Sequence, residues 1–320
     1  CHTAVQVRLV YRVTRGNTGM WKFIPSLQRL LKRLLKNRQK SYAGFSPPLY
    51  PLREGDRGRN PHFSAFSAPW FAVNYYDFLL MEIQNISGKA MHRPTWVEID
   101  LNALRHNLLA VKKWVGPQIK ILGIVKADAY GHGDYEVSRV LLNNGVEMLG
   151  IAILEEGIQL RDNGIKAPLL LLGGIFEEQI DSIIHYDLIP TVYDLKLAEV
   201  LSKKATYFNK KLKVHVYVDT GMGSIGVKYN KAVEFVQSLK DMKNLFIEGI
   251  YTHCSSSDEK NSAFTNLQIK RFRDVLDALD TIKVCIPLRH MANSGAILGY
   301  PESYFNMVRP GLSLYGLYPS

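Results

Sequence analysis

From Thr95 onward the sequence alternates short apolar runs with amphipathic segments, and this alternation most constrains the fold. Most of the runs are continuously apolar, which is typical of strands covered on both faces. After a short strand predicted for TWVEIDL, eight such runs follow. They are IKILGIVKA (119–127), MLGIA (148–152), PLLLLGG (168–174), LIPTVY (188–193), KVHVYVDT (213–220), LFIEGIYTH (245–253), IPLRHMANS (286–294) and NMVRPGLSLYGL (306–317).

Segments with helical periodicity lie between these runs. The first is LNALRHNLLAVKKWV, and Asp100 immediately before it is well placed to cap its N-terminus. Later examples are YEVSRVLLNNG, DLKLAEVLSKKA, NKAVEFVQSLKDM and SAFTNLQIKRFRDVLDALD. Eight strands alternating with helices over about 200 residues predict an α/β fold, a (β/α)8 TIM-type barrel. A doubly wound open sheet is the alternative, less favoured because no glycine-rich turn follows the first strand.

Residues 1–90 have a different composition from the rest. They contain 14 Lys and Arg against 4 Asp and Glu, whereas residues 91–320 contain 26 against 25. Within this leader, residues 44–70 carry five prolines and three glycines, too many for a helix or strand to persist. The segment SLQRLLKRLLKNRQK reads as a basic amphipathic helix. We therefore predict a poorly structured or non-native leader over 1–90, since Met91 directly precedes the patterned region, and a barrel over 91–320.

Composition excludes several classes of protein. The basic charge belongs to the leader and comes without a recognisable binding motif, so we expect no nucleic-acid partner. No apolar run approaches the roughly 20 residues that a membrane helix needs. The three cysteines are widely spaced and form no C-x-x-C pair, which argues against a disulfide framework and a zinc site. We expect a cytoplasmic protein with no metal.

Chemically useful side chains stand at the ends of the predicted strands, where barrel enzymes carry their active sites. Lys126 ends the first run, where burial would depress its pKa, although a solvent-exposed lysine is the commoner case. Asp219 begins the glycine-rich turn DTGMGSIG, and His253 ends the sixth run. Ser294 stands where a helix would begin, and Arg309 lies within the eighth run, where a buried charge needs a partner.

Each of these residues is ambiguous alone. Together they bring an amine, an anion-binding position, a histidine and a buried cation to one end of one barrel. That combination suits a phosphate-bearing aldehyde cofactor, and we predict pyridoxal phosphate held by a lysine.

Several segments also carry a family resemblance. VKADAYGHG, around Lys126, closely resembles the cofactor-lysine motif of the alanine racemases. The resemblance extends in family order through RPTWVEIDLNALRHN (93–107), VDTGMG (218–223), EGIYTHCSSSDE (248–259), HMANSGA (290–296) and FNMVRPGLSLYGLYPS (305–320). It implies a barrel followed by a β-rich domain, a homodimer, and interconversion of L- and D-alanine with pyridoxal phosphate. In that family the product supplies peptidoglycan synthesis.

Carried over position by position, the resemblance implies a role for each matching residue. Lys126 would form the Schiff base with the cofactor and act as the base for one face of the substrate's α-carbon. Tyr130 and Ser294 would bind the phosphate, together with the backbone amides of Gly311 and Leu312.

The resemblance implies two further positions at the cofactor ring. His253 would lie beside the ring, and Arg309 would pair with the pyridine nitrogen. An arginine there keeps that nitrogen unprotonated, which favours return to an amino acid over transamination.

Two positions depart from the family's pattern. Tyr217 stands where relatives have a lysine, often carbamylated, and Ser224 stands where they have an arginine near the substrate carboxylate. A hydroxyl cannot supply the bidentate, charged contact of a guanidinium. We therefore expect weaker carboxylate binding than in relatives that have the arginine.

The family's second domain would begin after Ser320, and it supplies the tyrosine that serves the opposite face of the α-carbon. We therefore expect this chain to be an incomplete racemase with one base. A single-domain barrel that binds or carries pyridoxal phosphate without racemising is the nearest alternative. A basic membrane- or nucleic-acid-associated protein with an inert barrel is a third hypothesis.

Overall fold

The computed structural model describes residues 10–13 and 95–318, and the chain divides into two compact units. In the unit spanning Val10–Glu98, strand β1 (Val10–Val13) pairs antiparallel with β2 (Thr95–Glu98). The strand predicted for TWVEIDL is therefore confirmed. Apart from Val10–Val13, the predicted leader lies outside the described residues, as does its amphipathic helix, and both stay predictions.

The larger unit is built on eight parallel strands whose pairings close a ring. Around the ring the order is β3, β4, β5, β6, β7, β9, β10, β11 and again β3. Because β6 pairs with β7 and β11 pairs with β3, the sheet has no free edge within the ring. The predicted (β/α)8 barrel is confirmed, and the open-sheet alternative is wrong. The strands are β3 (Lys120–Ile124), β4 (Met148–Ile151), β5 (Leu169–Leu171), β6 (Ile189–Val192), β7 (Leu212–Asp219), β9 (Leu245–Tyr251), β10 (Leu288–His290) and β11 (Met307–Val308).

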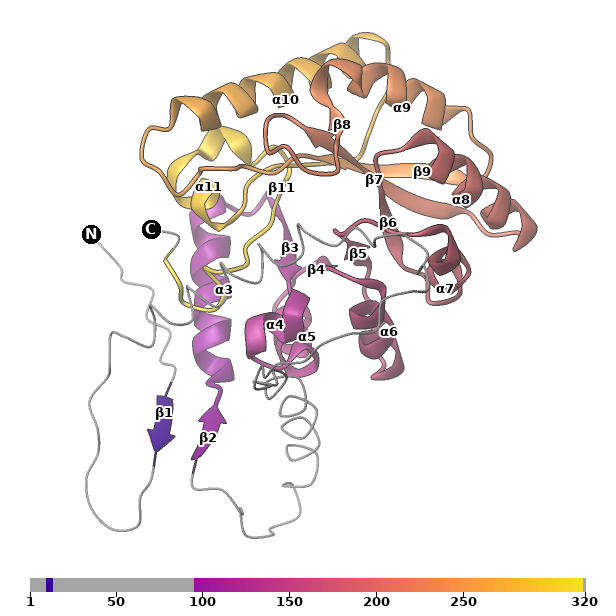
Figure 1. Cartoon of the computed structure of the whole chain (residues 1–320). Coiled ribbons are helices and arrows are strands. Elements are labelled where there is room, and N and C mark those ends of the chain that lie inside the picture. The colour runs from indigo at the N-terminus through magenta and orange to yellow at the C-terminus, as the bar shows by residue number, and fades with distance from the viewer. Residues whose placement is uncertain (1–9, 14–94, 319–320) are drawn as a thin grey trace, which may run out of the picture. The chain divides into compact units, whose positions relative to one another are not determined.

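Helices follow the strands around the outside of the barrel. Helix α3 begins as predicted, because the Asp100 carboxylate accepts the N–H groups of Asn102 and Ala103 at 2.9 and 3.1 Å. Helix α9 packs against β9, and α10 packs against α9 (Figure 1). The helices are α3 (Leu101–Val115), α4 (Lys126–Gly131), α5 (Asp134–Asn143), α6 (Leu154–Asp162), α7 (Ile180–His185), α8 (Leu195–Tyr207), α9 (Ala232–Lys240), α10 (Ala263–Thr281) and α11 (Ser294–Gly299).

A few short elements complete the unit. Strand β8 (Val227–Lys228) pairs with the end of β7 beside the ring. Three 3-10 helices precede other elements: η2 (Glu177–Gln179), η3 (Tyr229–Lys231) and η4 (Pro301–Ser303).

The barrel has an inner and an outer apolar layer. The inner cluster fills the barrel with side chains from six of its strands: Leu122, Ile124, Met148, Leu170, Ile189, Leu288 and Met307. The outer cluster joins the barrel to its helices. Along β7 the residues alternate, so that Val214, Val216 and Val218 join the outer cluster while His215 and Tyr217 take the opposite face. Polar side chains on that opposite face therefore enter the barrel interior.

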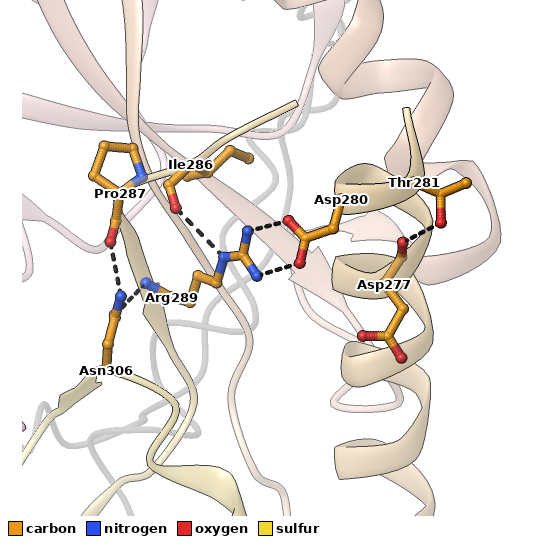
Figure 2. Close-up of polar contacts among 7 residues, drawn as sticks. All are labelled: Asp277, Asp280, Thr281, Ile286, Pro287, Arg289 and Asn306. Atoms are coloured by element: carbon orange, nitrogen blue, oxygen red, sulfur yellow. Dashed lines mark hydrogen bonds and ion pairs between the residues drawn. The ribbon is translucent and has the colours of Figure 1, made fainter. Parts of the chain in front are cut away.

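A set of polar contacts ties α10 to the N-terminal ends of β10 and β11 (Figure 2). The guanidinium of Arg289 forms a two-pronged ion pair with Asp280 near the end of α10. The side chain of Asn306 accepts the Arg289 backbone N–H at 2.8 Å and donates to the Pro287 carbonyl at 2.8 Å. These contacts stabilise the end of the barrel opposite the candidate site.

Candidate functional site

The five residues singled out at strand ends lie at the same end of the barrel. Asp219 ends β7, while Lys126, His253 and Arg309 follow β3, β9 and β11 by one or two residues. Ser294 begins α11, as predicted, and the Asn293 carboxamide caps that helix by accepting the Ala296 N–H at 3.0 Å. Parallel strands of a barrel deliver their C-terminal ends to one face, which explains why residues so distant in sequence meet.

The segment after Lys126 has a rare backbone conformation. Four consecutive residues, Ala127–Tyr130, have φ between 50° and 57° and so form a left-handed turn. Each non-glycine residue in this conformation costs about 1–2 kcal/mol. Strand β3 therefore ends at Ile124, earlier than the predicted 119–127, because the chain turns sharply as Lys126 is reached. A backbone with this much strain persists only where surrounding contacts hold it in place. Such strained segments are common at functional sites.

Glu156 on α6 provides the main contact that holds this turn. Its carboxylate accepts the Ala127 N–H at 2.7 Å with one oxygen and the Ala152 N–H at 2.6 Å with the other. A second contact comes from the Asp128 carboxylate, which accepts the Asp134 N–H at 2.9 Å. The turn that carries Lys126 is thus fixed to the neighbouring strand end.

The amine of Lys126 is in a reactive setting. Burial lowers its pKa, Arg309 lowers it further, and only Glu156 opposes the shift. No side chain or carbonyl in the described part of the chain forms a hydrogen bond with its Nζ atom. A lysine of lowered pKa has a larger neutral fraction, and only the neutral amine can attack an aldehyde.

Arg309 is a buried cation held by neutral acceptors. Its Nη2 donates to the Thr252 and Met291 carbonyls at 2.7 and 3.0 Å, and lies 3.2 Å from Nδ1 of His253. No carboxylate in residues 95–318 pairs with it, and its Nε has no acceptor there. Burial, Arg309 and Lys126 together lower the pKa of His253 to about 3, so the imidazole is neutral.

Backbone amides and hydroxyls converge a short distance away. The buried Ser294 Oγ accepts the N–H groups of Gly311 and Ser313 at 3.0 and 3.2 Å, and the Ser313 hydroxyl at 3.2 Å. Since three donors already point at this oxygen, its own O–H remains available for an anion. A Cβ atom at Gly311 would lie 3.0 Å from the Tyr130 hydroxyl, so the glycine allows this hydroxyl to approach the backbone closely. Leu312 follows directly, and all four predicted phosphate-binding positions therefore adjoin one another.

The two positions that depart from the family's pattern contact each other. The Tyr217 hydroxyl lies 2.6 Å from Ser224 Oγ, and the Tyr217 ring stacks on that of Tyr251 with centroids 4.8 Å apart. Burial raises the pKa of Tyr217, so its hydroxyl stays neutral. An uncharged pair thus stands where relatives would place two charged side chains.

Two residues of this region were missed by the sequence reasoning. Glu156 carried a usable signal, because a glutamate three residues into a helix often accepts backbone N–H groups at its start. His290, on β10, contacts Arg309 with Nδ1 at 3.0 Å from Nη1. It had no distinguishing signal of its own, since only strand register brings it to Arg309.

Two further findings concern the described residues only. Residues 10–13 and 95–318 contain no group of three His, Cys, Asp or Glu side chains that could hold a metal ion. Within the same ranges, no helix combines the length and apolar character needed to cross a membrane.

The site residues fit pyridoxal phosphate. The group needs an amine for its aldehyde, donors for its phosphate and a partner for its ring nitrogen. Within the described residues, the Lys126 amine has no hydrogen-bond partner and can meet the aldehyde, the Ser294 hydroxyl can donate to the phosphate, and Nε of Arg309, which has no acceptor, can donate to the ring nitrogen. The side chains present are therefore compatible with the cofactor.

Comparison with known proteins identifies the family. Residues 99–319 match the family model described as "Alanine racemase, N-terminal domain". The chain is 44% identical over 233 residues to an alanine racemase of Halothermothrix orenii, a match covering 73% of this chain and 62% of that protein. It is 40% identical over 228 residues to an alanine racemase of Methanococcus maripaludis, covering 71% and 61%.

Solved structures agree with the sequence matches. An alanine racemase of Clostridium difficile 630 in complex with cycloserine superposes with a TM-score of 0.71 at 39% identity, covering 72% of this chain and 64% of that one. An alanine racemase of Bacillus anthracis with bound L-Ala-P gives 0.67 at 33% identity, covering 72% and 60%. The chain thus spans about three fifths of the length of these relatives. Because the matched residues include every strand of the barrel and all the side chains gathered at its C-terminal end, the chain belongs to the alanine racemase family.

Proposed function

We propose that this chain binds pyridoxal phosphate covalently through Lys126 and acts on the α-carbon of alanine, in the interconversion of L- and D-alanine. The observation that carries the proposal is the partly buried Lys126 amine, with its lowered pKa, at the barrel end that also holds Arg309 and Ser294. Kinship with alanine racemases supports alanine as the substrate. The biological role we infer is supply of D-alanine for peptidoglycan.

The phosphate would be held by neutral donors. In the proposed arrangement, the hydroxyls of Tyr130 and Ser294 bind its oxygens together with the N–H groups of Gly311 and Leu312. The support is the contact between Ser294 and the Gly311 N–H, and the close approach of the Tyr130 hydroxyl to Gly311. Burial raises the pKa of Tyr130 to about 12, so its hydroxyl remains a donor.

The ring would lie beside His253, with its nitrogen at Arg309. His253 is neutral, and its Nδ1 lies 3.2 Å from Nη2 of Arg309. A neutral imidazole does not repel the Arg309 cation, and it can lie beside the aromatic ring of the cofactor. Arg309 donates from every hydrogen-bonding atom and accepts at none. In this proposal its Nε faces the ring nitrogen as a donor, which holds that nitrogen unprotonated.

Proton transfer at the α-carbon would fall to Lys126. Pyridoxal phosphate, when bound, supplies an electron sink that makes the α-proton acidic. The neutral Nζ of Lys126 can take and return that proton on one face of the carbon. A single group cannot lie on both faces, so Lys126 alone accounts for exchange and not for inversion.

We also propose a homodimeric assembly and a cytoplasmic location for this protein. Met222, Ile225 and Phe264 are exposed apolar residues near the glycine-rich turn after β7, and a second copy that covers them would make the active protein a homodimer. Cys254 and Cys285 are free thiols, in keeping with a cytoplasmic setting.

Exchange of the α-proton of alanine tests the proposal. The chain is incubated with pyridoxal phosphate and alanine in deuterium oxide, and deuterium at the α-carbon is followed by NMR. We expect exchange with the native chain and none with Lys126→Arg, which keeps the charge but loses the nucleophile. Cofactor binding without any exchange would overturn the proposal in favour of a carrier barrel.

A further inference from the structure

A pair of buried histidines lies in the barrel interior beneath Arg309. His215 on β7 and His290 on β10 are both fully buried, and Nδ1 of His215 lies 3.0 Å from Nε2 of His290. The two strands flank β9, and the pair meets across it. A Cβ atom at Gly249 on β9 would lie 2.5 Å from the His215 ring. A glycine at that position is therefore required for the His215 ring to reach its partner.

The hydrogen bonds of this pair can run in only one direction. Arg309 is always a donor, so Nδ1 of His290, 3.0 Å from its Nη1, must be the acceptor. A neutral His290 then carries its proton on Nε2 and donates to Nδ1 of His215. His215 in turn must carry its proton on Nε2. Burial and the nearby Arg309 lower the pKa of both histidines, which keeps them neutral.

An acid stands at the far end of the pair. Nε2 of His215 lies 3.5 Å from Oε2 of Glu248 on β9, within ion-pair distance, and both atoms are buried with no hydrogen-bond partner among the described residues. The other carboxylate oxygen of Glu248 lies 2.7 Å from Nζ of Lys213, a half-exposed lysine. Although burial opposes it, hydrogen bonds from His215 and Lys213 lower the pKa of Glu248. Glu248 is thus an ionised acceptor facing the one free N–H of the pair.

We propose that His215 and Glu248 are positioning residues for Arg309, through a directed relay of two hydrogen bonds, from Arg309 to His290 and from His290 to His215, that ends in the 3.5 Å contact between His215 and Glu248. This relay fixes the tautomer of His290 so that an acceptor always faces the guanidinium. It also connects Arg309 to the acid Glu248. Arg309 has no direct carboxylate partner among the described residues. With Nη1 and Nη2 so occupied, Nε is left for the ring nitrogen of the cofactor. The inference rests on the proposed function for the last step only.

The tautomers can be read without any cofactor. The full chain is labelled with 15N-histidine, and long-range proton–nitrogen correlation spectra identify which ring nitrogen of each histidine carries hydrogen. His215→Gln and His290→Asn assign the two sets of signals, and exposed His106 and His185 provide references in water. We expect His215 and His290 to remain neutral and protonated at Nε2 throughout the range in which free histidine titrates, around pH 6.5. Protonation at Nδ1 of either ring would overturn the relay.

Variants of Glu248 test the positioning role. Glu248→Leu removes the acid that faces the Nε2–H of His215. Because Arg309 still sets the direction of the pair, we expect both tautomers to be kept, and the His215 Nε2–H resonance to move upfield and exchange faster with water. With pyridoxal phosphate, we expect a dissociation constant raised about tenfold and an altered pH dependence of the bound cofactor's absorbance. Glu248→Gln offers an amide oxygen as acceptor and should restore the native His215 Nε2–H signal. Arg161→Lys, a destabilising change far from the relay, should leave the histidine signals unaltered.

The outcomes separate this inference from the proposed function. An unchanged cofactor spectrum and an unchanged His215 Nε2–H signal in Glu248→Leu would contradict the positioning role. If Glu248→Leu does not fold, the spectra of the native chain still decide the tautomers. Predicted tautomers in a chain that forms no linkage to pyridoxal phosphate would contradict the proposed function alone. Reversed tautomers in a chain that does form that linkage would contradict the relay alone.

Discussion

The carboxylate of Glu156 accepts the backbone N–H of Ala127 at 2.7 Å, and so anchors the residue next to Lys126. Ala127 is the first residue of a left-handed turn of four residues. The position of the candidate catalytic amine therefore depends on a side chain from the next strand–helix unit. Glu156 also raises the pKa of Lys126 against the lowering effect of burial.

Replacing Glu156 with alanine should destabilise the barrel. Three backbone N–H groups would lose their acceptor, those of Ala127 and Ala152 and the more distant, exposed one of Ile153. Each of the first two, if left unpaired, costs about 1–3 kcal/mol. The pKa of Lys126 should also fall, since the charge that opposes its lowering is removed. Urea unfolding measures the first effect. Glu155→Ala, an exposed change one residue earlier, is the control, and equal losses from both variants would contradict this role.

Ser224→Arg should improve the binding of the substrate carboxylate. Ser224 is exposed, so an arginine can be accommodated beside Tyr217. A charge-assisted contact contributes about 1.5–3 kcal/mol, which corresponds to a fall in the Michaelis constant for alanine of about tenfold or more. The constant is measured in the exchange reaction, with Ser224→Gln as a neutral control of similar reach. A Michaelis constant that does not fall would count against the prediction.

Because His253 is neutral in the folded protein, we predict that the free energy of unfolding falls in acid. Burial lowers its folded-state pKa to about 3, while the unfolded chain has a value near 6.5. Between these values the unfolded state binds more protons, so the free energy of unfolding falls as the pH falls. His253→Asn keeps an acceptor for Arg309 but does not titrate, and should lose less stability from about pH 7 to about pH 5.

Other groups titrate in the same range, and the comparison removes their effect. Burial raises the pKa of Asp134 to about 6, which stabilises the folded state as the pH falls below that value. Asp134 is present in both proteins, so it cancels from their difference. Parallel pH profiles for the native chain and His253→Asn, measured by urea unfolding without cofactor, would show the assignment to be wrong.

Arg161→Lys should cost more stability than a break in the Arg289–Asp280 ion pair. The Arg161 guanidinium donates at 2.7 to 2.9 Å to four backbone carbonyls, those of Ile165, Ala167, Tyr186 and Asp187. A lysine cannot donate to all four, and we expect a loss of about 1–3 kcal/mol. Asp280→Asn disrupts a pair whose acid is half exposed, at a cost below about 1 kcal/mol. The reverse order in thermal or urea unfolding would contradict this ranking.

The barrel was predictable because its strands are covered on both faces and read as continuous apolar runs. Helix α3 was predicted at its observed bounds, Leu101–Val115, since its periodicity and its Asp100 cap are both local signals. Strand ends were less accurate. The predicted strand 119–127 is shorter in the structure, Lys120–Ile124, because a left-handed turn ends it. That turn depends on Glu156, which lies outside this stretch of sequence.

The gathering of Lys126, His253, Ser294 and Arg309 followed from parallel topology alone. The links between buried polar groups did not. His215 and His290 are 75 residues apart, and they meet because β7 and β10 both pair with β9 and because residue 249 is a glycine. The strand register and the space left by a glycine affect distant residues only in the assembled barrel. A short stretch of sequence therefore cannot predict such contacts.

Reduction with borohydride tests the central claim most directly. The chain is mixed with pyridoxal phosphate, reduced and digested, and the labelled peptide is identified by mass spectrometry. We predict a single pyridoxyl label on Lys126, within KADAYGHG, and no label at that peptide in Lys126→Arg. A label on another lysine, or no reducible linkage at all, would contradict the account.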